Sequence, residues 1–246
     1  MSFLQNFSPR IVFLALAVVF CFVLVAPTQA ALINPPIAGQ SLPDLFSGCA
    51  GCTLLATLAP QTVLSSNGNW SGTLVTSVFS DPAPIAGVRA GAGLDFFYQI
   101  SNNSPCIGCT AGPDNIGRFT AISFLPGQIP GGLLVDIGIN GGSVPGFNPA
   151  GTASPGLVDR VPPGDTIGWG YATPGSVALT PGTTSIIMEV ATNALNYNTG
   201  HASALDGGTA NYLAFQPSSG VPEPATTLLI GVGMLALASL RRFRRS

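Results

Sequence analysis

The sequence contains no lysine and has little charge of either sign. Its 246 residues include 8 arginines and 10 acidic residues, so that 7% of the chain is charged and the formal net charge is −2. A typical soluble domain has about 25% charged residues. Without lysine the chain cannot form a P-loop, a Schiff base or a lysine-rich tract for nucleic acids. Several classes of nucleotide, carbonyl and nucleic-acid chemistry are therefore excluded.

Residues that commonly carry catalysis are also scarce. His201 is the only histidine, and no Gly-x-Ser-x-Gly nucleophile elbow occurs between a strand and a helix. Because Asn198-Thr199-Gly200 is typical of a turn, we expect His201 to lie on an exposed loop. Most carboxylates stand beside turn formers, as Asp81 does before Pro82, which indicates turn capping rather than a hydrolytic carboxylate pair. We expect no catalytic residue, metal or cofactor, and a secreted glycan hydrolase is the alternative.

The first 30 residues have the pattern of a secretory signal peptide. Arg10 and the amino terminus are positive, residues 11–26 are mostly apolar, and small side chains follow at Thr28 and Ala30. The pattern predicts passage through the secretion translocon and cleavage by signal peptidase between Ala30 and Ala31. An uncleaved anchor is the alternative, although the apolar run is short for a membrane span.

The last 26 residues, 221–246, consist of three parts. Val221-Pro222-Glu223-Pro224 is followed by the apolar run 225–240, and a basic tail, 241–246, ends the sequence. As a helix the apolar run would extend roughly 24 Å, and arginine side chains that reach the interface would help it match a core of ~30 Å. The positive-inside rule then places the basic tail in the cytoplasm and residues 31–220 across the membrane. The arginines of the basic stop are Arg241, Arg242, Arg244 and Arg245.

These three parts resemble the PEP-CTERM sorting signal of Gram-negative bacteria. That signal combines a Pro-Glu-Pro motif, a hydrophobic helix and an arginine cluster, and an exosortase-type membrane protease recognises it. The resemblance implies that Pro222, Glu223 and Pro224 are recognition residues and that the chain is the substrate. It also implies transient anchoring in the membrane before placement at the cell surface or in the extracellular matrix. The two prolines disfavour a helix and leave an extended peptide for a protease. A permanent tail anchor is the alternative.

Residues 31–220 are predicted to form one exported domain. Glycine and proline are abundant, at 31 and 22 residues in the whole chain, but apolar residues alternate with others in short runs bounded by turn formers. This period of two indicates half-buried strands, and no amphipathic helix of ten residues or more is evident. We expect an all-β sandwich with Greek-key or jelly-roll connections. The expected strands are 72–79, 94–101, 119–124, 135–140, 167–171, 186–191 and 210–215.

Four cysteines remain after removal of the signal peptide. They form two similar motifs, Cys49-Ala50-Gly51-Cys52 and Cys106-Ile107-Gly108-Cys109. An oxidising compartment favours disulfides, and the shared glycine favours pairing within each motif. Pairing between the motifs, a four-thiolate zinc site and redox-active thiols are the alternatives. Thr53 and Thr110 follow the motifs where a c-type haem would require histidine.

The charged and aromatic residues of the exported region indicate which partners it could bind. The exported region has three arginines and nine acidic residues, which argues against nucleic acid as a partner. Trp169 and Tyr171 are expected in the core. Trp70 follows Asn67-Gly68-Asn69, and we expect it in an exposed turn where it could stack on a sugar. The sequence therefore predicts a structural or adhesive protein of the cell envelope or matrix, and a module that binds exopolysaccharide is the alternative.

Overall fold

The computed structural model describes residues 51–219, apart from residues 111–113, 130, 141–143, 149–150 and 162–164. The expected signal peptide, sorting motif, apolar run and basic tail lie outside the described residues. In the part of the chain that is described, no helix has the length and apolarity needed to cross a membrane.

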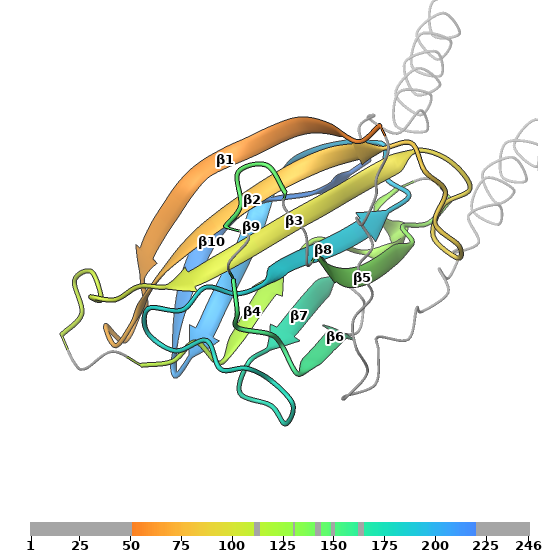
Figure 1. The fold of residues 1–246 in the computed structure, drawn as a ribbon. Helices are drawn as coiled ribbons and strands as arrows, with labels where there is room; N and C mark the ends of the chain where they lie inside the picture. The colour runs from red at the N-terminus through yellow and green to blue at the C-terminus, as the bar shows by residue number, and fades with distance from the viewer. Residues whose placement is uncertain are drawn as a thin grey trace, which may run out of the picture.

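Two five-stranded antiparallel sheets pack face to face, so the predicted all-β fold is confirmed (Figure 1). The described residues include a single short helix, the 3₁₀ turn η1 (Pro126–Gln128). In spatial order, the first sheet contains β1 (Thr53–Leu64), β2 (Ser71–Asp81), β3 (Gly93–Asn102), β8 (Ile187–Thr192) and β5 (Val135–Asn140). The second contains β10 (Gly208–Ser218), β9 (Asn196–Asp206), β4 (Arg118–Ala121), β7 (Thr166–Gly170) and β6 (Leu157–Val161).

The core lies between the two sheets and is rich in aromatic rings. Tyr98 of β3 packs against Phe119 of β4 and Trp169 of β7, with ring centroids 5.8 and 6.0 Å apart. All three side chains are fully buried. The hydroxyl of Tyr98 crosses the core and donates a 2.8 Å hydrogen bond to the carbonyl of Phe215 in β10. Burial on this scale is the main source of stability in a sandwich.

Strand β3 is buried on both faces, whereas the sequence predicts a half-buried strand. On the outer face Phe97 packs against Phe79 and Phe147, with centroids 5.2 and 6.2 Å apart. The segment 144–148 covers this face, and Gln99 holds it there by donating to the carbonyl of Asn148 and accepting from the Asn148 amide. A loop remote in sequence thus supplies a second apolar cluster.

Six of the expected strands correspond to β2, β3, β5, β7, β8 and β10. The seventh, expected over 119–124, is only partly a strand because β4 ends at Ala121 and Ser123 has a φ of 69°. Three strands were not predicted: β1, β6 and β9. In β9 the buried positions are Gly200, Ala202 and Ala204, whose small side chains give little apolar signal.

Candidate functional site

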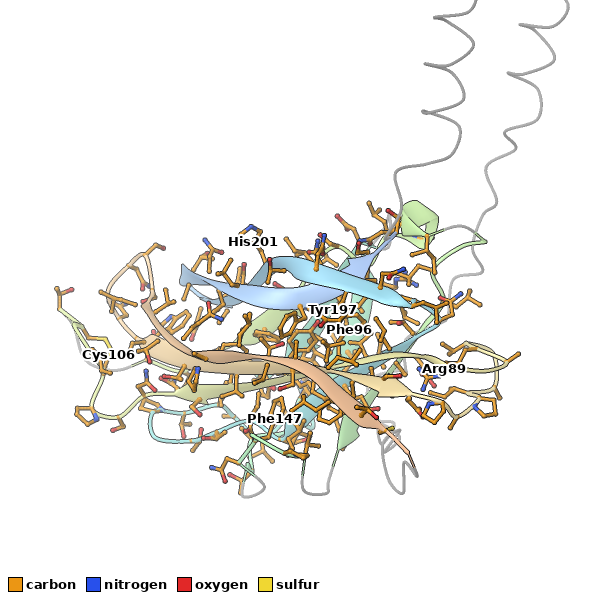
Figure 2. All side chains as sticks on the ribbon, turned by 90° about the horizontal axis from the view of Figure 1, so that it is seen from above. Arg89, Phe96, Cys106, Phe147, Tyr197 and His201 are labelled. Carbon is orange, nitrogen blue, oxygen red and sulfur yellow. A yellow bond between two sulfur atoms is a disulfide. The ribbon has the colours of Figure 1, made fainter. Side chains whose placement is uncertain are left out.

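The candidate site is the end of the sandwich at which β10 stops. Strand β10 ends at Ser218, paired with Asn196 at the start of β9, and the predicted recognition motif begins only three positions later in the sequence. The loop 82–92, between β2 and β3, lies at the same end. Figure 2 shows Arg89 of this loop at one end of the sandwich and Cys106 at the other.

A buried arginine fixes the loop 82–92 to both neighbouring strands. The Arg89 guanidinium donates to both carboxylate oxygens of Asp95, at 2.6 and 3.3 Å, and to Asp81. It also donates to the carbonyls of Ala83 and Thr192, at 3.0 and 2.9 Å. The three charged side chains are at most 4% exposed, so the cluster is a desolvated ion-pair network.

Glycine is required beside this network. A Cβ at Gly93 would collide with the Thr192 carbonyl oxygen and with the Arg89 side chain. Asp81 additionally accepts a 2.8 Å hydrogen bond from the Ala83 amide, so the turn-capping role expected for this aspartate is confirmed. Its ion pair with Arg89 was not predicted.

Burial also changes the acidity of carboxylates at this end. Desolvation raises the pKa of Asp95 from 3.8 to about 6, and the hydrogen bond and charge of Arg89 oppose the shift. Desolvation likewise raises the pKa of Asp136 in β5, against a hydrogen bond from the Ile137 amide. Arg89 also bonds Asp81, a contact that does not involve Asp95.

Asn193, just after β8, connects the end of this strand to the segment 131–134. Its Oδ1 accepts from the Leu134 amide at 2.9 Å, and its Nδ2 donates to the Gly132 carbonyl at 2.9 Å. Because Arg89 bonds the carbonyl of Thr192, the adjacent residue, the loop 82–92 and the segment 131–134 are held to the end of β8. An open, mainly apolar hollow lies between residues 84–90 and Leu134.

The short helix η1 completes this end of the sandwich. Gln128 donates its side-chain amide to the carbonyl of Pro217, one residue before the end of β10. Leu125, at the start of η1, is 42% exposed, and Leu195, just before β9, is 69% exposed. Large apolar side chains therefore stand in solvent close to where β10 stops.

Cys52 lies beside the ion-pair network, and its sulfur and oxygens of Asp81 and Asp95 lie within 4.8 Å of one another. Three such ligands could hold a metal ion. However, Cys52 is disulfide-bonded, so it has no thiolate to offer, and Arg89 bonds both carboxylates. The residues fit an ion-pair network better than a metal site.

The predicted pairing within the second cysteine motif is confirmed. Cys106 and Cys109 form a disulfide with their Cα atoms 5.6 Å apart, at the end of the sandwich opposite Arg89 (Figure 2). This pairing contradicts a bridge between the motifs at these two residues. Cys49, the expected partner of Cys52, lies outside the described residues.

The expected sugar-stacking role of Trp70 is wrong, because its side chain is fully buried. Trp70 directly precedes β2 and lies on the same inward face as Leu74 and Val78, and its indole nitrogen donates to the carbonyl of Asp206 at 3.3 Å. The turn before it, therefore, directs the ring into the core. Trp169 and Tyr171 are buried as expected.

His201 is exposed as expected, but it lies in strand β9 and not in a loop. Its cross-strand neighbour is Leu213 of β10, an apolar residue that is 50% exposed. Asn198-Thr199-Gly200, interpreted as a turn, continues the pairing of β9 with Gln216, Phe215 and Ala214. The ladder with β10 overrides the local turn preference of these residues.

The remaining predicted site residues lie outside the described residues. They are the cleavage pair Ala30 and Ala31, the motif Val221, Pro222, Glu223 and Pro224, and the arginines 241, 242, 244 and 245.

Sequence reasoning missed the Arg89 network, whose only local signal is that two of the few charged residues flank a loop rich in proline and glycine.

Comparison with protein families matches residues 220–245 to the PEP-CTERM protein-sorting motif. Comparison with the curated proteins and with the solved structures finds no significant match.

Proposed function

We propose that the chain, which carries a PEP-CTERM sorting motif at residues 220–245, is an exported exosortase substrate whose sandwich domain has a structural or adhesive role at the cell surface. The motif implies transient anchoring in the membrane followed by placement at the surface. The proposal adds that the domain itself, once released from its tail, is the functional product and a component of the extracellular matrix.

The observation that carries the proposal is the position of the motif directly after a finished domain. Strand β10 is paired with β9 along its whole length, from Gly208 to Ser218, and the match to the sorting motif begins at residue 220. Removal of the tail after this point would leave all ten strands of the sandwich unchanged. This arrangement suits a signal that is discarded after delivery.

A non-enzymatic role is supported by how the ionisable side chains are used. Arg89 is bonded to Asp81 and Asp95 inside the fold, and Arg118 pairs with Asp159 at 2.6 Å. His201 lies on the exposed face of β9, opposite an apolar neighbour in β10. Such pairs and exposed positions stabilise a fold or face solvent, and they are poor arrangements for proton transfer to a substrate.

The proposal is tested by expressing the full chain in its native host with Pro222, Glu223 and Pro224 changed to alanine. We expect an unprocessed protein that stays with the membrane, whereas Ser219→Ala should be processed normally. Mature wild-type protein should resist extraction from the surface or matrix fraction, and His201→Ala should do the same. Free diffusion of the mature domain into the medium would contradict the structural role.

A further inference from the structure

We propose that, while the tail is still in place, the β10 end of the sandwich rests on the phospholipid surface, with Leu125 and Leu195 among the headgroups. The surface consists of the loop 82–92 and residues 122–129, 131–134 and 193–195, and is called here the membrane-facing end. The inference rests on the membrane anchoring that the sorting motif implies and goes beyond it in naming a contact made by the folded domain.

The connection between β10 and the apolar run is short. Strand β10 ends at Ser218, and the apolar run of the motif starts at residue 225. The six intervening residues let the chain reach at most about 25 Å from Ser218 to residue 225, even when fully extended, and part of that length must cross the headgroup layer, which is roughly 6 Å deep on each side of the bilayer. The end of β10 is therefore held within a short distance of the headgroups.

Exposed apolar side chains lie around the end of β10. Leu195 directly precedes Asn196, the pairing partner of Ser218. Leu125 belongs to the turn that Gln128 joins to Pro217. Leu195 and Leu125, which are 69% and 42% exposed, therefore both lie close in the chain to residues that bond the last two residues of β10. Burying apolar side chains of this size in the interface would be favourable.

The charged side chains near the membrane-facing end are largely buried. Arg89, Asp81 and Asp95 lie at this end but are buried and paired with one another. Asp165 and Asp136 are half-buried, and burial raises the pKa of Asp136. The described residues of the membrane-facing end thus carry no exposed arginine, so contact with lipid would depend on apolar burial and not on attraction to anionic headgroups.

Hydrogen bonds beneath this surface hold its loops in fixed positions. Asn193 ties Leu134 and Gly132 together, and Arg89 fixes the loop 82–92 to Thr192. An open hollow lined by Pro84, Ile85 and Val88 faces out from the same loop. Apolar groups of several loops are thereby held around the end of one strand.

The test uses the full chain, reconstituted in vesicles of phosphatidylethanolamine and phosphatidylglycerol, with a photoreactive diazirine analogue of leucine at one position at a time. The probe replaces Leu195 or Leu125 in two variants. Matched controls carry it at Ile107 or Val177, which are 61% and 53% exposed and lie away from the membrane-facing end. A fifth variant carries it at Leu228, inside the apolar run. Lipid adducts are then quantified by mass spectrometry.

We expect several-fold more lipid adduct from positions 195 and 125 than from 107 and 177, at low and at high salt alike. Equal yields at the four positions, with strong labelling from position 228, would overturn the contact and leave the anchoring intact. Absence of adducts at position 228 would remove the anchoring and the inference together. If position 195 labels the sorting protease instead of lipid in native membranes, the surface is a protein interface and the proposal is wrong.

Discussion

The side-chain amide of Gln61 pairs with the backbone of Leu213 as a neighbouring strand would. Its Nε2 donates to the Leu213 carbonyl at 2.7 Å, and its Oε1 accepts from the Leu213 amide at 2.8 Å. Gln61 belongs to β1, at the edge of the first sheet, and Leu213 to β10, at the edge of the second. The pair therefore joins the two sheets along one side and satisfies backbone groups that an open edge would expose.

Replacing Gln61 with alanine should remove both hydrogen bonds and expose the Leu213 amide to solvent. Because the site is partly exposed, we expect a loss of about 1 kcal/mol in the free energy of unfolding. The decisive readout is hydrogen exchange at the Leu213 amide, which should become faster. In the matched control, Leu213→Ala, the backbone bonds remain and the amide should stay protected. An unchanged exchange rate in Gln61→Ala would contradict the role of this pair.

The Arg89 network should be the most sensitive polar feature of the domain. Arg89→Met would leave the carboxylates of Asp81 and Asp95 buried without a counter-charge, and we expect a loss of about 3–5 kcal/mol near pH 7. The control is Arg118→Met, which breaks the half-exposed pair with Asp159 and should cost less than about 1 kcal/mol. Chemical denaturation measures both. Equal losses in the two variants would show that burial of the network is unimportant.

Stability should rise as the pH falls through the pKa of Asp95. Because burial raises that pKa to about 6 from 3.8, the folded state binds a proton at a pH where the unfolded state does not. The contribution of Asp95 to stability therefore increases from neutral pH down to about pH 4 and then levels off. Asp136 acts in the same direction, so the Asp95→Asn variant is needed to isolate the effect.

Urea unfolding at a series of pH values measures this dependence. The variant Asp95→Asn should show a smaller gain in stability on acidification than the wild type. A wild type and variant with parallel pH profiles would mean that Asp95 titrates at its ordinary pKa in the fold.

The Cys106–Cys109 disulfide should stabilise its own loop more than the whole domain. It closes a very short loop, for which the chain-entropy model gives about 2 kcal/mol. We expect the Cys106→Ser, Cys109→Ser double variant to lose that amount and to keep the two-sheet fold in circular dichroism. Faster hydrogen exchange should be confined to residues around 103–110. Global unfolding of this variant would contradict the assignment.

Much of the fold could be predicted because large apolar side chains recur at every second position in most strands, even where both faces of the strand are buried, as in β3. Leu94, Phe96 and Tyr98 give this signal in β3, and the expected boundaries agree closely with the structure. The signal fails where inward residues are small, as at Ala202 and Ala204 in β9. It also fails for β1, where Pro60 lies in a register irregularity between Leu58 and Gln61 and where an edge position tolerates proline.

Of the candidate site, the sorting motif could be predicted from the sequence, whereas the hydrogen-bond networks of Arg89 and Asn193 could not. Sorting signals are read from contiguous residues, so the match at 220–245 confirms a prediction made from sequence. The Arg89 network instead joins residues of β2, β3 and the loop between them, and Asn193 joins β8 to the segment 131–134. Such contacts arise from sheet topology, which local patterns do not encode. The burial of Trp70 likewise depends on the tertiary packing of β2, which places Trp70 in the core with Leu74 and Val78; the turn 67–69 alone does not determine it.

The most direct test of the account is the intact mass of the protein recovered from its native host, alkylated without prior reduction. We predict a chain that begins at Ala31, ends near Pro222 and carries two disulfides and no alkylated cysteine. That result would establish export, removal of the tail and pairing of the cysteines in one spectrum. A mass that still includes residues 225–246 would mean that the tail is a permanent anchor, and the central claim would be wrong.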